Sequence, residues 1–75
     1  MALKNIGSWN VGDRCRVNFI MDGWMTGTIR AFASNPAERG RMEAIVEFSA
    51  MPHKTMHPLH DLHTVPKLGL VRRTN

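Results

Sequence analysis

All four histidines of this 75-residue chain lie within one eleven-residue segment, HKTMHPLHDLH (53–63). Histidine side chains can bind a metal ion or exchange a proton near neutral pH. The separation of His53 and His57 would suit two ligands on one helix face, but Pro52 and Pro58 bracket the pair and disfavour a helix. The segment contains no cysteine and a single acidic residue. We therefore predict no metal site here.

An extended segment fits these residues better. On a strand, His53, Thr55 and His57 share one face, and Lys54 and Met56 point to the other. Two alternatives follow for the shared face. It is either part of a solvated strand and turn, or it lines an interface.

The segments around the histidines have the pattern of strands. In DRCRVNFIM (13–21), apolar and polar residues alternate, which indicates a strand with one buried face. The residues expected on that face are Cys15, Val17, Phe19 and Met21. Asp22-Gly23 follows and predicts a type I′ hairpin turn, in which both central residues have positive φ. We expect the return strand at 24–33.

Within the return strand, Ile29 and Phe32 are the expected core residues, and Gly27 suggests a bulge. A polar loop, 34–41, leads to a third strand at 42–50. There we expect one apolar face and, on the opposite face, Glu43 and Glu47. The apolar face is expected to hold Met42, Ala44, Val46 and Phe48.

The remaining segments complete a small all-β domain. They are a short extended piece at 53–57, one helical turn at 58–62 and a last strand at 63–65. Five short antiparallel strands with this order predict an SH3-like five-stranded barrel. We assign the barrel to residues 11–66, an N-terminal segment to 1–10 and a C-terminal tail to 67–75. So small a barrel is filled by its own side chains, so a ligand must bind on its surface or between subunits.

Composition indicates what must support such a domain. A chain of this length buries only about 60% of its unfolded surface, and its lone cysteine, Cys15, allows no intrachain disulfide. A metal ion or oligomerisation is then the expected support. The single cysteine favours a reducing compartment, and MALKNIGSW (1–9) lacks a signal-peptide-like apolar run. We therefore expect a cytoplasmic protein with no membrane partner.

Several motifs together resemble the type II dihydrofolate reductases, the plasmid-borne enzymes associated with trimethoprim resistance. They are GDRCR (12–16), Trp24, the Gly27-x-Ile29 pattern, VEFSAMP (46–52), the His57-Pro58 pair and Leu62. The family reads GDRVRK, a tryptophan, G-x-I, VESEAHPGSVQIYP and a leucine. The resemblance covers about residues 11–65.

This resemblance implies a homotetramer around one pore, in which NADPH passes a hydride to dihydrofolate. The family's V-Q-I-Y strand corresponds to Lys54, Thr55, Met56 and His57. Thr55, Met56 and His57 are thus the implied catalytic and cofactor-binding residues, and Lys54 is an electrostatic contributor to NADPH binding. The resemblance also makes Trp24 an interface residue. Three positions depart from the family pattern: Thr55 replaces glutamine, His57 replaces tyrosine, and Val17 replaces a lysine.

The charge of the chain supports a second hypothesis. Ten lysines and arginines against six acidic residues give a net charge of +4, which attracts polyanions. A Tudor- or KOW-type module binding nucleic acid would use basic residues to contact phosphates. The candidates are Arg14, Arg16, Arg39 and Arg41. The third hypothesis is a structural oligomer that lacks reductase activity.

Overall fold

The computed structural model describes residues 3–66, and its regular structure consists mostly of strands. The elements in chain order are β1 (Asn5–Ile6), β2 (Trp9–Asn10), β3 (Arg14–Phe19), β4 (Gly23–Asn35), the 3₁₀ turn η1 (Pro36–Glu38), β5 (Arg41–Glu47), β6 (Thr55–Pro58) and the 3₁₀ turn η2 (Leu59–Asp61). The predicted all-β class is confirmed. No helix among residues 3–66 has the length and apolar character needed to cross a membrane.

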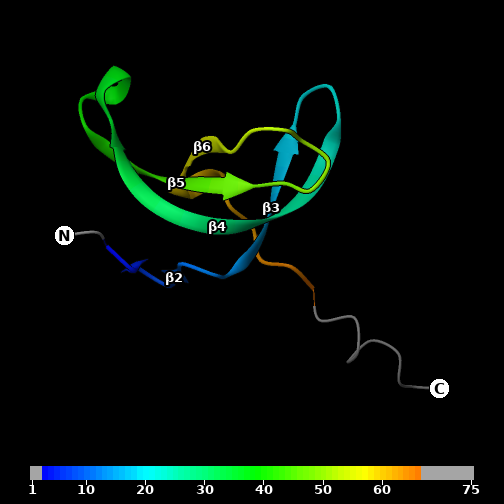
Figure 1. Ribbon diagram of the computed structural model, residues 1–75, viewed down its shortest axis with the longest axis horizontal. Helices are drawn as coiled ribbons and strands as arrows, with labels where there is room; N and C mark the ends of the chain where they lie inside the picture. The colour runs from blue at the N-terminus through cyan, green and yellow to red at the C-terminus, as the bar shows by residue number, and fades with distance from the viewer. Residues whose placement is uncertain (1–2, 67–75) are drawn as a thin grey trace.

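The strands form an antiparallel four-stranded sheet in the order β3-β4-β5-β6 and a separate β1-β2 pair. The long β4 curves beneath β5 (Figure 1). The sheets are open, so the prediction of a closed five-stranded barrel was wrong. The segment predicted as the fifth strand contributes only an isolated bridge, in which Arg16 and His63 exchange backbone hydrogen bonds of 2.8 and 2.9 Å. The predicted tail, 67–75, lies outside the described residues.

The β3–β4 hairpin is confirmed, but its predicted turn type was wrong. Phe19 pairs with Gly23, which leaves a three-residue loop at 20–22. A type I′ turn at Asp22-Gly23 would need positive φ at both residues. Gly23 has a φ of 75°, but Asp22 does not have a positive φ, because Arg39 is the only residue other than glycine with one within 3–66. Gly23, the first residue of β4, has the positive φ at the end of this turn, a conformation that glycine adopts without steric cost. Met21 therefore belongs to the loop and is 90% exposed instead of buried.

The core lies on the inner face of the sheet and includes most of the residues predicted to be apolar and buried. Its buried residues are Cys15, Val17, Ile29, Phe32, Ala44, Val46, Phe48 and Leu62. The bulge expected at Gly27 is instead a register shift between Ile29 and Ala31. Gly27 is needed for a different reason. A Cβ there would lie 2.7 Å from side-chain atoms of Val46 and Phe48, so only glycine lets β5 pack this closely.

Glu43 contradicts the predicted alternation of β5, because it is 2% exposed instead of facing solvent. Arg41 Nη2 donates a hydrogen bond of 2.6 Å to Glu43 Oε2, and Asn35 Nδ2 donates one of 3.1 Å to Oε1. These two donors lower the pKa of the Glu43 carboxyl, Arg41 most strongly. A buried carboxylate is tolerated when it is paired in this way.

Candidate functional site

The histidine strand, β6, carries Thr55 and His57 on one face, as predicted. The two residues pair with Val46 and Ala44 of β5, both of which are buried. Thr55 Oγ1 and His57 Nε2 are hydrogen-bonded at 2.6 Å. The His57 ring also packs edge-on against the rings of Phe19 and Phe48, with centroids 5.5 and 5.7 Å apart. The polar atoms of this pair therefore satisfy each other beside the apolar core.

The other residues of the predicted reductase site lie apart from this pair. Met56 pairs with Ile45 and is 38% exposed, and Lys54 precedes β6 and is exposed. His53 is also exposed and lies outside β6. His60 lies 3.5 Å from the carboxylate of Asp61. Within residues 3–66, no three His, Cys, Asp or Glu side chains come together as a metal site would require.

Burial beside the core lowers the pKa of His57, an effect that the carboxylates of Asp61 and Glu43 oppose. The unfolded chain then binds more protons than the folded chain below about pH 6.5, the ordinary pKa of histidine. We expect the free energy of unfolding to be constant above that pH and to fall as the pH drops toward the lowered pKa of His57.

Urea unfolding at pH 8 and pH 5.5 measures this effect. Both pH values lie above the ordinary titration range of the carboxylates, so carboxylate protonation contributes little to the difference. The loss between the two values should shrink in His57→Phe, which cannot be protonated. It should persist in the control His60→Gln, which changes an exposed histidine. An equal loss in wild type and His57→Phe would exclude His57 as its cause.

A second polar surface lies on the opposite face of the sheet, over the β3–β4 hairpin. We call it the outer face. It consists of Arg14, Arg16, Asn18, Trp24, Thr26 and Thr28, which point away from the core side of the two strands. The sequences of β3 and β4 contain no acidic residue. The outer face is therefore a basic surface with one large aromatic residue.

Trp24 and Arg16 form the centre of the outer face. The guanidinium carbon of Arg16 lies 4.7 Å from the Trp24 ring centroid, a cation–π arrangement. Arg16 Nε also donates a hydrogen bond of 3.1 Å to the carbonyl of Thr64. The His63 ring packs edge-on against Trp24, with the centroids 4.9 Å apart. Trp24 is nevertheless 49% exposed, so a ligand can still reach it.

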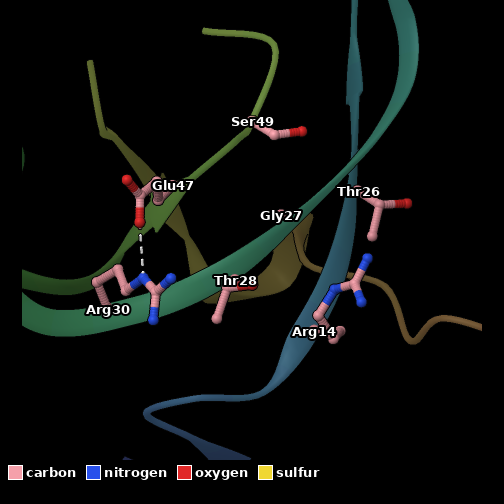
Figure 2. A pocket seen from close by; sticks show the side chains of 7 residues that line it. All are labelled: Arg14, Thr26, Gly27, Thr28, Arg30, Glu47 and Ser49. Atoms are coloured by element: carbon pink, nitrogen blue, oxygen red, sulfur yellow. Dashed lines mark hydrogen bonds and ion pairs between the residues drawn. The ribbon is translucent and has the colours of Figure 1, made fainter. Parts of the chain in front are cut away.

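A polar pocket of about 380 Å³ adjoins Arg14 at the β2-proximal end of the outer face. Figure 2 shows Arg14 and Arg30 on either side of Thr28, with the Arg30 guanidinium turned toward Glu47. Arg30 Nε donates a hydrogen bond of 2.8 Å to Glu47 Oε1. The other lining residues are Thr26, Gly27 and Ser49. Among residues 3–66, neither Arg14 nor Arg16 is in an ion pair.

The four arginines proposed as phosphate contacts thus separate into two groups. Arg14 and Arg16 lie together on the outer face, whereas Arg41 is engaged with Glu43 and Glu38 at the η1 end of β4. Arg39 belongs to that end too, directly after η1. Sequence reasoning missed the proximity of Trp24 to Arg16. The alternation of Trp24, Thr26 and Thr28 along the return strand was the signal for it.

Comparisons with protein families, with curated proteins and with solved structures found no match for this chain. The resemblance to the type II dihydrofolate reductases therefore stays a prediction, as does the homotetramer that it implies.

Proposed function

We propose that this domain binds nucleic acid through the outer face of its β3–β4 hairpin. The observation that carries the proposal is the group formed by Arg14, Arg16 and Trp24 on a surface whose strands contain no carboxylate. Neither arginine is in an ion pair among residues 3–66. Arg16 Nε donates to the Thr64 carbonyl, and the remaining guanidinium N–H groups are donors suited to phosphate oxygens. Thr28 and Thr26 pair across the two strands with Arg14 and Arg16, and their hydroxyl groups offer further donors.

The geometry of the remaining charges supports the same surface. Glu43 neutralises Arg41, and Glu47 neutralises Arg30, so the net charge of +4 is not spread evenly over the molecule. The outer face keeps its charge because its two arginines are not in ion pairs among the described residues. A polyanion is therefore attracted to the hairpin more strongly than to the η1 end of the sheet.

The expected result is salt-dependent binding of a fluorescein-labelled 20-base-pair duplex, measured by fluorescence anisotropy. Two or three phosphate contacts would give a slope of log K against log salt between about −2 and −3. Unlabelled duplex of unrelated sequence should compete, because phosphate contacts carry no sequence information. An absence of binding at 50 mM salt and high protein concentration would overturn the proposal.

The second candidate is an NADPH-dependent dihydrofolate reductase of the type II kind. One observation favours it: Thr55 and His57 share one face of β6, as the glutamine and tyrosine of the family pattern would on the same strand. Hydride transfer needs the nicotinamide and pterin rings positioned against each other, and the cofactor supplies the chemistry. In this reading four copies of β6 surround the two ligands.

The reductase candidate has a direct test. NADPH oxidation by purified protein, with dihydrofolate and trimethoprim present, should be measurable and should decrease in Thr55→Ala. Sedimentation velocity gives the oligomeric state independently. A monomer without turnover would remove this candidate and leave the nucleic-acid proposal unaffected.

A further inference from the structure

The tip of the β3–β4 hairpin presents two neighbouring apolar side chains to solvent. Ile20 is 98% exposed and Met21 is 90% exposed. The other exposed large apolar side chains among residues 3–66 do not exceed 49%. Neither side chain packs against the core of the domain. Two adjacent large apolar residues at full exposure indicate a contact with a partner.

The position of the tip restricts what that partner can be. Figure 1 shows the 20–22 loop extending from the sheet at the opposite end of β4 from η1. The stem below the tip carries the basic outer face, with Arg14 and Arg16 on β3. A partner that is anionic where it meets the stem and apolar where it meets the tip would complement both surfaces. Duplex nucleic acid has this arrangement, because its phosphates lie outside and its stacked bases lie inside.

The dimensions of the hairpin fit this partner. Ile20 is four positions after Arg16, and a strand rises about 3.3 Å per residue, so their Cα atoms lie about 13 Å apart along an extended chain. The grooves of duplex DNA are about 7.5 to 8.5 Å deep. The tip can thus reach the base pairs while Arg16 stays at the phosphates. The carboxylate of Asp22 in the same loop repels phosphates, a cost that Arg14 and Arg16 must offset.

We propose that Ile20 and Met21 form an apolar wedge that inserts between stacked base pairs of a duplex held by Arg14 and Arg16. Isoleucine and methionine are among the side chains that proteins insert at base steps, where they partly unstack the bases and bend the duplex. This inference rests on the proposed nucleic-acid function and adds the kind of ligand, a deformable duplex.

A wedge makes binding depend on how easily the duplex is deformed. Pyrimidine–purine steps unstack readily, whereas A-tracts are stiff. Two duplexes of equal length, one with central TA steps and one with an A-tract, carry the same phosphates. The narrow minor groove of the A-tract attracts arginine more strongly, so a preference for the flexible duplex cannot come from the arginines and must come from the inserted side chains.

The test compares wild type, the double variant Ile20→Ser/Met21→Ser and the control Val11→Ser on both duplexes. The tip variant should retain the wild-type melting temperature, since both side chains are exposed. We expect wild type to bind the TA duplex about tenfold more tightly than the A-tract duplex, and the tip variant to lose this preference. Val11→Ser removes another exposed apolar side chain, far from the tip in sequence, and should behave as wild type. 2-Aminopurine beside the TA step should brighten with wild type only.

Three results would overturn the inference, and they are distinguishable. Wild type and tip variant binding both duplexes equally, without 2-aminopurine brightening, would remove the wedge and leave the proposed function intact. Wild type binding neither duplex would remove both proposals. A wild-type oligomer that the tip substitutions dissociate, with duplex binding unchanged, would identify the tip as an interface between copies of this chain.

Discussion

Replacing Gly27 by alanine is expected to lower the free energy of unfolding by about 2 to 3 kcal/mol, the upper part of the usual range for overpacking a core. The new Cβ would lie 2.7 Å from Val46 Cγ1, 2.7 Å from Phe48 Cδ1 and 2.8 Å from the Glu47 carbonyl oxygen. Backbone cannot rotate away as a side chain can, so β5 must move relative to β4. The gain from a less flexible unfolded chain, about 0.4 to 1 kcal/mol, does not offset this.

The measurement is thermal and urea unfolding of Gly27→Ala beside Ser34→Ala, which alters an exposed residue of the same strand. A loss of this size corresponds to a decrease of roughly 10 to 20 °C in the melting temperature of so small a domain. Ser34→Ala should change stability by less than about 0.5 kcal/mol. An unchanged melting temperature in Gly27→Ala would contradict the close approach of β4 and β5.

Gly27 also connects the core to the outer face. It lies between Thr26 and Thr28, which point to the pocket in Figure 2, while its own missing side chain admits Val46 and Phe48. Glu47, which holds Arg30, belongs to the segment that a side chain at position 27 would displace. The variant should therefore loosen the Arg30–Glu47 pair as well as the core.

The sequence alone predicted the parts of the fold that depend on local alternation. Cys15 and Val17 are buried as expected, because a period of two fixes which side of a strand faces the core. Ile29 and Phe32 are buried as expected too, but they are three positions apart, and the register shift between Ile29 and Ala31 brings both to the core side. Periodicity does not report whether a sheet closes on itself. Closure depends on strand pairing far apart in the chain, and the predicted last strand supplies only one bridge, Arg16 with His63.

Local patterns also failed where a tertiary contact decided the conformation. Glu43 is buried because Arg41 and Asn35 come together around its carboxylate, which alternation cannot anticipate. Gly27 looked like a bulge because glycine in a strand has two common roles, a bulge and a close approach. In the structure Gly27 has the second role, because the side chain of Phe48 occupies the space that a Cβ at position 27 would need.

The candidate sites were predictable to different degrees. The shared face of Thr55 and His57 follows from strand geometry alone, and their hydrogen bond agrees with it. Their packing against Phe19 and Phe48 was not visible in the sequence, because those rings come from two other segments. Arg14 and Arg16 were correctly placed on one strand face. Their proximity to Trp24 depends on the hairpin register, which could not be predicted correctly from the wrong turn type.

Removing both arginines of the outer face should produce the largest effect on nucleic-acid binding. Each hydrogen bond from a charged group to a phosphate contributes about 1.5 to 3 kcal/mol, so Arg14→Gln/Arg16→Gln should weaken duplex binding about a hundredfold or more. The slope of log K against log salt should also become shallower by about 2, one unit for each lost contact. Both are measured by anisotropy titration over a range of salt concentrations.

The matched control is Arg39→Gln/Lys54→Gln, which removes the same two charges from exposed positions outside the outer face. Both double variants reduce the net charge from +4 to +2. If only the overall charge attracts the duplex, the two variants should weaken binding equally. If the outer face holds the phosphates, the control should change affinity less than about threefold and leave the salt slope unchanged, because distant exposed charges are largely screened beyond about 10 Å at 0.1 M salt. Equal losses in the two variants would contradict a localised site at Arg14 and Arg16, and with it the outer face as the binding surface.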